Sequence, residues 1–440
     1  PDPVGTLVYE DDFSDIAGED AKSGLKDQKD EQQFGVGFHT PGVFHVKLAE
    51  NNNTRWVPLP RFVYGDFSLQ IELWDNSDKF TGDVAQGVIF RVRDNNHLYA
   101  ALLDPRKGQY AVRKLDGQDN WTDLIPWKGS ELVKRKADHN ILRVDAAGEK
   151  FTIYLNGRLL DQFSDASYGP GMVGMIVANV DAVTPHMHFD NLKIWGNDPA
   201  PLDPGLTPTR QDPNGDMALI PGGEFILGGN EQDEAPAQIF ALPNFYLDRY
   251  EVTNEAYARC VAAQKCTPLK SNASQSHPNY ATEAQYAKFP VINVTWEQAN
   301  TFCGWAGKRL PTEAEWEKAA SWDAAKRVKT IWPWGNVFDK KFLNSDESQN
   351  GDTTAGGQYS EEINHTFDLG GNVSEWTSSL YKPYPYTESD GREDPQAAGE
   401  RVYRGGSWAQ SEGKARSVWR QGADPGNPFT EVGFRCAVTP

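Results

Sequence analysis

The clearest helix start in the sequence lies in the stretch Trp305-Ala306-Gly307-Lys308-Arg309-Leu310-Pro311-Thr312-Glu313-Ala314-Glu315-Trp316-Glu317. Thr312 and Glu315 have the spacing of a capping box, in which the threonine hydroxyl accepts from an early backbone N–H and the glutamate reaches back. A helix is therefore predicted to begin after Thr312. The residues that recur at helical spacing, and that we expect to face a core, are Trp316, Ala319 and Ala320.

Two further helices are predicted on the N-terminal side of this stretch. Thr295 and Gln298 repeat the capping-box spacing. Thr253 is the expected cap of a third helix, which carries Tyr257 and Cys260. The sequence around these helices is rich in Trp and Gly, so long irregular stretches are expected between them.

Seven more short blocks accompany the first one in a fixed order along the chain. They are residues 217–228, 245–257, 290–296, 332–336, 371–377, 404–408 and 433–436. In this order the eight blocks resemble the formylglycine-generating enzyme superfamily, also called the sulfatase-modifying-factor family. The resemblance covers residues 217–440 and implies a C-type-lectin-like α+β domain with little regular secondary structure.

The family's active members oxidise a cysteine of a sulfatase peptide to formylglycine, using two copper-binding cysteines a few residues after the Gly-Gly-Ser block. Soft thiolate ligands are needed because they select Cu(I). Here Gln410 and Ala415 stand where the resemblance places the thiols, and no cysteine occurs between Cys303 and Cys436. We therefore expect no copper and no catalytic residue of this type. The candidates that remain for ligand contact are Ser407, Trp408 and Gln410.

The four cysteines are expected to form disulfides. The resemblance implies a bridge from Cys303 to Cys436, and Cys260 and Cys266 then pair by elimination. Oxidised bridges imply an extracytoplasmic location.

Calcium binding is the family property that the sequence is expected to retain, because its loops offer hard oxygen ligands. The ligands implied for a first site are the side chains of Asp368 and Glu375 and the carbonyls of Gly371 and Val373. A second implied site uses Asn344, the carbonyl of Ser345 and, more weakly, Asp352. The alternative is that these loops are turns with incidental polar groups.

The N-terminal part has a different pattern, in which apolar residues alternate with period two. Residues 67–73 are one example, and Asn156-Gly157 is a hairpin signal because a tight primed turn needs positive φ at both positions. Short strands at regular spacing predict a two-sheet antiparallel β-sandwich. Residues 1–195 resemble the concanavalin-like and laminin-G-like jelly-roll modules of secreted bacterial proteins, through residues 7–13 and 189–194. Five prolines within residues 196–216 indicate an interdomain linker.

The first and last strands of such modules are neighbours, which would bring Asp11 or Asp12 near Asp190. Carboxylates gathered there are weak candidates for a Ca²⁺ site, and solvated strand-end acids are the equal alternative. His186-x-His188-x-Asp190 also places three potential ligands on one face of a strand. We interpret that face as facing solvent, because the apolar residues Met187 and Phe189 alternate with these three and so lie on the opposite face of the strand.

The overall composition limits the function further. There are 43 basic and 62 acidic side chains among 440 residues, a formal charge of −19, which disfavours binding to nucleic acid or to an anionic membrane. No apolar run approaches the roughly 18 to 20 residues needed to cross a bilayer. Because the chain begins at Pro1, we expect that a signal or anchor segment has been removed.

The sequence therefore predicts a secreted or cell-surface binding protein without catalytic activity. A glycan or protein ligand, a homo-oligomer, an extracellular assembly and a receptor ectodomain are all compatible with it. The alternative is an enzyme, either a divergent oxidase of the formylglycine-generating or sulfoxide-synthase type or a glycan hydrolase that uses the sandwich.

Overall fold

The computed structural model describes residues 2–3, 5–14, 28–30, 34–39, 42–48, 54–77, 82–118, 120–179, 184–196, 209–230, 233–324 and 326–439. The chain divides into two compact units, residues 1–199 and 200–440. Most of the predicted linker, residues 197–208, lies outside the described residues. None of the helices in the described part of the chain is long and apolar enough to cross a membrane.

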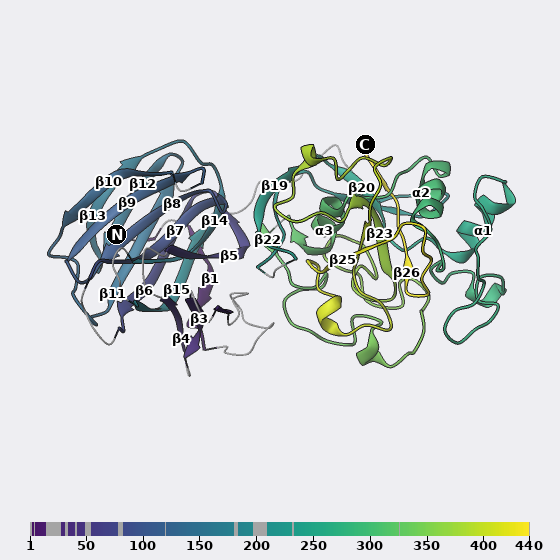
Figure 1. Ribbon diagram of the computed structural model, residues 1–440, viewed down its shortest axis with the longest axis horizontal. Helices are drawn as coiled ribbons and strands as arrows, with labels where there is room; N and C mark the ends of the chain where they lie inside the picture. Colours follow the sequence, from purple (N-terminus) through teal and green to yellow (C-terminus); the bar gives the residue numbers. More distant parts are fainter. Residues whose placement is uncertain are drawn as a thin grey trace. The chain divides into compact units, whose positions relative to one another are not determined.

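The first unit is built from antiparallel strands in two sheets (Figure 1). One sheet has the order β13-β12-β11-β6-β15-β4-β3-β2, and β1 also pairs with β15. Its strands are β1 (Thr6–Asp11), β2 (Gln28–Asp30), β3 (Phe34–His39), β4 (Val43–Leu48), β6 (Phe67–Asp75), β11 (Asn140–Ala147), β12 (Lys150–Leu155), β13 (Arg158–Ser164) and β15 (His186–Gly196). The other sheet contains β10 (Trp121–Gly129), β9 (Gln109–Asp116), β8 (His97–Asp104), β7 (Val84–Asp94), β14 (Gly171–Asn179) and β5 (Thr54–Tyr64), in that order.

The core of the sandwich follows from the alternation in the sequence. Phe67, Leu69, Ile71 and Leu73, which share one face of β6, are all 0 % exposed. The hairpin between β12 and β13 turns at Asn156-Gly157, and both residues have positive φ, 50° and 78°. The predicted antiparallel sandwich is confirmed, as is the pairing of the first strand, β1, with the last, β15.

In its described residues, the second unit has short strands, three α-helices and much irregular chain (Figure 1). Its helices are α1 (Asn254–Ala262), α2 (Trp296–Trp305), α3 (Glu313–Ser321) and the 3₁₀ turns η2 (Ala284–Tyr286), η3 (Asp346–Ser348), η4 (Glu388–Asp390) and η5 (Glu412–Lys414). Its strands are β16 (Thr209–Arg210), β17 (Met217–Ile220), β18 (Gly223–Leu227), β19 (Gln238–Leu242), β20 (Phe245–Asp248), β21 (Trp322–Asp323), β22 (Val328–Lys329), β23 (Ser374–Leu380), β24 (Arg401–Arg404), β25 (Arg420–Ala423), β26 (Val432–Gly433) and β27 (Ala437–Val438). The predicted α+β domain with little regular structure is confirmed.

All three helices begin where the capping signals predicted. Thr253 accepts from Ala256, and both Thr295 and Thr312 form complete capping boxes. The predicted linker extends too far, because β16 at residues 209–210 pairs with β17. A two-residue strand has no alternation of its own, so only its partner strand reveals it.

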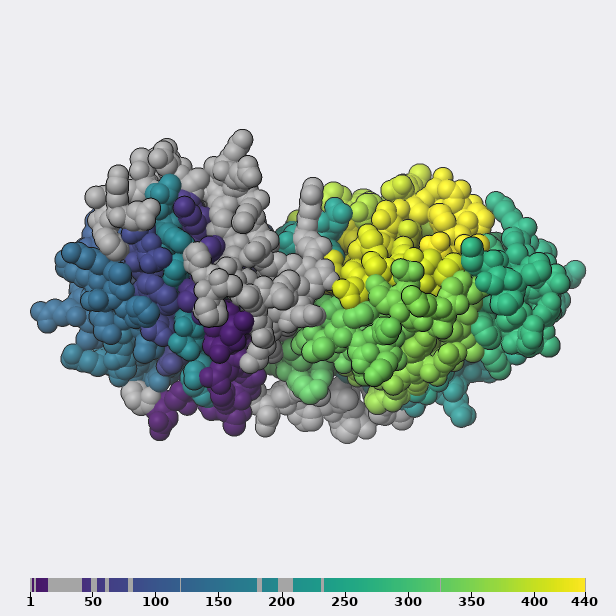
Figure 2. All heavy atoms as spheres, turned by 90° about the horizontal axis from the view of Figure 1, so that it is seen from below, coloured from purple at the N-terminus to yellow at the C-terminus, as the bar shows by residue number. Residues whose placement is uncertain are grey.

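Segments far apart in sequence meet in the sheet of the second unit. β23 pairs with β24 and, in parallel, with β26. At the surface, the yellow C-terminal segment lies beside a green segment from earlier in the second unit (Figure 2).

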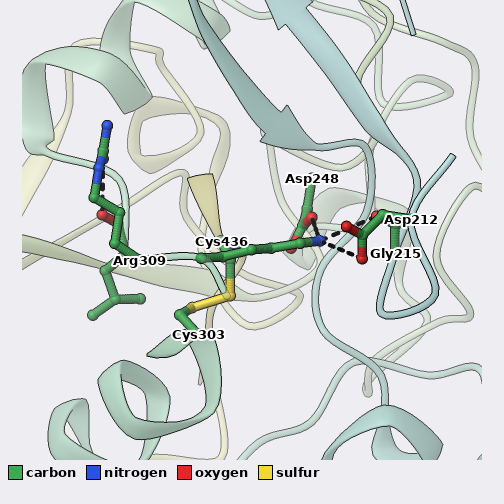
Figure 3. Close-up of a disulfide and its surroundings, with 8 residues drawn as sticks. Asp212, Gly215, Asp248, Cys303, Arg309 and Cys436 are labelled. Carbon is green, nitrogen blue, oxygen red and sulfur yellow. Dashed lines mark hydrogen bonds and ion pairs between the residues drawn. A yellow bond between two sulfur atoms is a disulfide. The ribbon is translucent and has the colours of Figure 1, made fainter. Parts of the chain in front are cut away.

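The predicted disulfides Cys303–Cys436 and Cys260–Cys266 are both present. The first joins α2 to the residue that precedes β27, beside a buried ion pair (Figure 3). The Lys308 Nζ lies 2.6 Å from an Asp248 oxygen and 3.2 Å from Asp212, and the other Asp248 oxygen accepts from the Cys436 N–H. Asp212, from the expected linker, is therefore part of the second unit.

The burial of Lys318 on α3 can be tested through the pH dependence of the free energy of unfolding. Its Nζ donates to the Gly223 carbonyl, and burial lowers the pKa of Lys318 to about 7, below its usual value of 10.5. Lys318 therefore takes up a proton on unfolding between pH 7 and pH 9, and it should contribute a rise of about 2 kcal/mol to the free energy of unfolding across that window. Because other buried groups such as Glu362 also titrate there, the test is a comparison: in urea titrations at both pH values, the change from pH 7 to pH 9 should be about 2 kcal/mol more positive in the wild type than in Lys318→Met.

The exposed Lys341 provides the matched control. Lys341→Met should show the same rise as the wild type. An equal rise in Lys318→Met would mean that Lys318 keeps its ordinary pKa in the folded state.

Candidate binding site in the second unit

The turn after β24 contains the three residues that the sequence singled out for ligand contact. Gly405 and Gly406 begin it with φ of 96° and 71°, and a Cβ on Gly405 would lie 2.6 Å from the Leu369 carbonyl oxygen. Both glycines are therefore needed for the chain to turn here. Ser407 follows and is 1 % exposed, and its carbonyl accepts from the Gln410 N–H at 3.0 Å. Ser407 thus stabilises the turn through its backbone.

Trp408 and Gln410 bring unused hydrogen-bonding atoms to this turn. The Trp408 Nε1 and the Gln410 Oε1 are both buried and have no hydrogen-bond partner among the described residues. The turn is also held at both ends, because the Trp408 N–H donates to the Asn372 carbonyl and the Asp346 N–H donates to the Gln410 carbonyl. A buried polar atom without a partner costs about 1–3 kcal/mol, so a water or ligand is expected to complete this donor and this acceptor.

Ala415, where the resemblance places the second thiol, is part of the apolar core. Ala415 is 2 % exposed and packs in one cluster with Trp332 and Leu343. A methyl group there can neither bind copper nor donate a proton. The four cysteines of the chain are all used in the two disulfides, so no thiol remains for a copper centre.

A cluster of buried acids lies behind the neighbouring loop, around Arg435. The guanidinium of Arg435 binds both oxygens of Glu375, with the Nε 2.8 Å from each, and the Trp316 indole donates to Glu375 at 2.7 Å. Three further buried acids also interact electrostatically with Arg435, and these are Glu251, Glu362 and Asp368. One cation therefore faces four buried carboxyl groups.

Burial raises the pKa values of three of these acids. It raises the pKa of Asp368 to about 6 and that of Glu362 to about 8, although Arg435 acts in the opposite direction. The pKa of Glu251 lies well above its usual range, because of burial and of the Asp368 charge. Near neutral pH, the negative charge of the four acids would therefore exceed the positive charge of Arg435, unless protons or a bound cation balance it.

The first predicted calcium site fits this cluster only in part. Glu375 has both oxygens bound by Arg435 and Trp316, so it is an ion-pair partner rather than a free calcium ligand. Asp368 does fit, because its Oδ1 is buried without a hydrogen-bond partner among the described residues, as is the Oε2 of Glu251. Glu251 also lines a cavity of about 390 Å³. Glu251 lies within one of the eight sequence blocks, residues 245–257, but the sequence alone does not indicate a role for it.

The second predicted calcium site is occupied by internal hydrogen bonds. The Oδ1 of Asn344 accepts from Ser348 and Asn350, and the carbonyl of Ser345 accepts from Ser348. One oxygen of Asp352 accepts from the Ser274 hydroxyl at 2.6 Å and from the Ser276 N–H at 2.9 Å. Calcium binding by Asn344, Ser345 and Asp352 stays a prediction, in which the ion would replace some of these hydrogen bonds.

In the first unit, Asp12 lies near enough to Asp190 for the two charges to interact. Asp11 accepts from the Tyr9 hydroxyl and from the Phe13 N–H, and Asp12 accepts from Ser14. Burial raises the pKa of Asp190, and the charges of Glu72 and Asp12 add to this effect. Calcium binding at Asp11, Asp12 and Asp190 stays a prediction.

Comparison with known proteins decides the family. Residues 204–440, more than half of the chain, match the sulfatase-modifying factor enzyme 1-like domain family. The chain belongs to this family. The match includes the residues around β16, which agrees with their place in the second unit.

Relatives within the family differ in their named activities. The serine/threonine-protein kinase Pkn1 of Chlamydia trachomatis serovar L2 is 36 % identical over 239 residues, which cover 50 % of this chain and 38 % of the kinase. The inactive C-alpha-formylglycine-generating enzyme 2 of Bos taurus is 28 % identical over 279 residues, covering 50 % of this chain and 87 % of that protein. Among solved structures, Treponema denticola variable protein 1 is 24 % identical, with a TM-score of 0.43, and the match covers 53 % of this chain and 98 % of that one. The chain thus spans well under half the length of the kinase relative.

Proposed function

We propose that the chain is a non-catalytic binding protein of the cell exterior, on a formylglycine-generating-enzyme scaffold without its oxidase centre. The observation that carries this proposal is the pairing of all four cysteines in two disulfides, with no cysteine between Cys303 and Cys436. Disulfides persist in oxidising compartments, which supports a location outside the cytoplasm. The bovine relative that is named inactive supports a family role without oxidation.

The ligand is proposed to bind at the turn of residues 407–410. Trp408 supplies an indole donor and Gln410 supplies an acceptor, and both atoms are buried without partners among the described residues. A glycan hydroxyl can both accept from the Trp408 Nε1 and donate to the Gln410 Oε1. This turn therefore fits a glycan or the glycan of a glycoprotein, presented at a cell surface.

A glycan array tests this site with the tag-free chain. The chain is expected to bind at least one glycan class, and Gln410→Ala is expected to weaken that binding about tenfold, since it removes one buried hydrogen bond to the ligand. Gln421→Ala, at an exposed position of β25, should bind like the wild type. Glycan binding that is unchanged in Gln410→Ala would place the ligand site elsewhere.

Calcium is proposed as a structural ion bound by Asp368 and Glu251. At a Ca²⁺ concentration about 100 times the Kd, bound calcium should raise the thermal midpoint of the second unit by about 5–10 °C relative to the protein in EDTA. Ca²⁺ should give this rise more strongly than Mg²⁺, which demands stricter octahedral geometry. The measurement is a thermal melt followed by near-UV circular dichroism.

The variants make this calcium prediction specific. Asp368→Asn should abolish the response to Ca²⁺, whereas Asp424→Asn, at an exposed position, should retain it. A wild-type midpoint that does not respond to Ca²⁺ would refute the calcium proposal without affecting the glycan site.

A further inference from the structure

Three histidines lie together on the outer face of one sheet of the sandwich. β15 carries His186 and His188, and its pairing with β4 places His188 directly opposite His45. The residues that alternate with them, which are Phe44, Val46, Met187 and Phe189, are all 0 % exposed in the core. Because side chains alternate along a strand, the three imidazoles must share the other face. This confirms the outward orientation predicted for His186 and His188.

The nitrogens of these imidazoles have the spacing of a metal site. The His186 Nε2 lies 3.2 Å from the His45 Nδ1 and 3.2 Å from the His188 Nε2. All three ligand nitrogens lie within 4.8 Å of one another. In a tetrahedral zinc site with Zn–N bonds of about 2.0–2.1 Å, two ligand nitrogens are about 3.3 Å apart. The two shorter separations therefore match the edges of such a tetrahedron.

The surrounding rings hold the imidazoles in place. His186 and His188 meet edge to face with centroids 4.7 Å apart, and the Trp74 ring packs on the edge of His188 at 5.2 Å. Trp74 is itself stacked on His139 at 4.0 Å. His188 is only 7 % exposed although it lies on the outer face. The ligand geometry is thus organised before any ion binds, which reduces the entropic cost of binding.

We propose that His45, His186 and His188 bind a divalent transition-metal ion, with Zn²⁺ as the first choice. Neutral imidazole is the commonest protein ligand for such ions and suits zinc, copper and nickel. Three nitrogen ligands without a carboxylate disfavour Ca²⁺ and Mg²⁺, which prefer oxygen. A tetrahedral ion held by three protein ligands takes a fourth ligand from water or from a bound molecule. In the sequence, Asp190 is the third potential ligand after His186 and His188, whereas in the structure the third ligand is His45 from the neighbouring strand β4.

Zinc titration of the full, tag-free chain tests this proposal. The protein is stripped with EDTA, dialysed and titrated with Zn²⁺ in competition with a chromophoric chelator. The wild type should bind one equivalent, and His45→Gln and His186→Gln should each lose at least 90 % of the affinity, because one of three ligands is removed. His97→Gln and His277→Gln, which change histidines outside the cluster, should bind like the wild type.

Two further measurements keep the result clear if a variant folds poorly. Co²⁺ bound to the wild type should give the intense visible absorption of a tetrahedral site. Zn²⁺ should also protect His45, His186 and His188, but not His277, from diethylpyrocarbonate as mapped by mass spectrometry. Absence of an equivalent of bound zinc in the wild type, or equal modification of these histidines with and without Zn²⁺, would show that they form only a hydrogen-bonded chain.

Discussion

Arg435→Met is expected to lower the free energy of unfolding of the second unit by about 3–5 kcal/mol, because it leaves buried charges without a partner. Arg435 is 0 % exposed and binds both oxygens of Glu375. It also donates to the carbonyls of Asp248 and Phe367, so its loss removes backbone contacts as well. Urea unfolding monitored by tryptophan fluorescence measures the change.

Arg309 offers a matched control for this prediction. It also binds a glutamate with two bonds, since its two terminal nitrogens each lie 2.6 Å from an oxygen of Glu315. Its side chain is 40 % exposed, however, so water can take the place of the guanidinium at this half-exposed pair, and Glu315, although only 5 % exposed, also accepts from the Thr312 N–H. Arg309→Met should therefore cost far less than Arg435→Met. Equal costs for the two variants would mean that the buried acids do not depend on Arg435.

Removing the Cys303–Cys436 disulfide is expected to destabilise the second unit by about 5 kcal/mol in the chain-entropy model. The bridge closes a loop with a sequence separation of 133 and joins α2 to the end of the chain. Without it, the unfolded chain gains conformational freedom that the folded state does not have. The double variant Cys303→Ala with Cys436→Ala tests this by urea unfolding.

The other bridge is the control, because Cys260–Cys266 spans a separation of only 6. The same model gives about 2 kcal/mol for a loop of this size. The paired alanine variant at Cys260 and Cys266 should therefore lose less than half as much stability. A larger loss from this shorter bridge would show that local packing, rather than loop length, sets the contribution of these disulfides.

Features that depend on a few adjacent residues could be predicted from the sequence. The capping boxes at Thr295 and Thr312 need only residues three positions apart, and both helices begin there. The sandwich follows from the period-two pattern, and Asn156-Gly157 marks its hairpin. The β16 strand was missed, because its two residues pair with β17 across a turn and have no pattern of their own.

The candidate sites depend on contacts between distant residues, and these were only partly predictable. The motif around Glu375 could not show that Arg435 binds both of its oxygens. The sequence therefore suggested Glu375 as a calcium ligand, whereas in the structure it is the ion-pair partner of Arg435. The strand of His186 and His188 offered two ligands, but the third comes from His45, whose position depends on strand order. Glu251 lay within a recognised block, and its buried unpaired oxygen was the signal that only the structure supplies.

The claim that this family member lacks oxidase activity is tested most directly by a peptide-oxidation assay. The chain is incubated with Cu(I), oxygen, a reductant and a cysteine-containing sulfatase peptide, alongside an active formylglycine-generating enzyme, and the products are identified by mass spectrometry. With all four cysteines in disulfides, the peptide cysteine is expected to stay unconverted while the active enzyme forms formylglycine. Formation of the aldehyde by this chain would contradict the account.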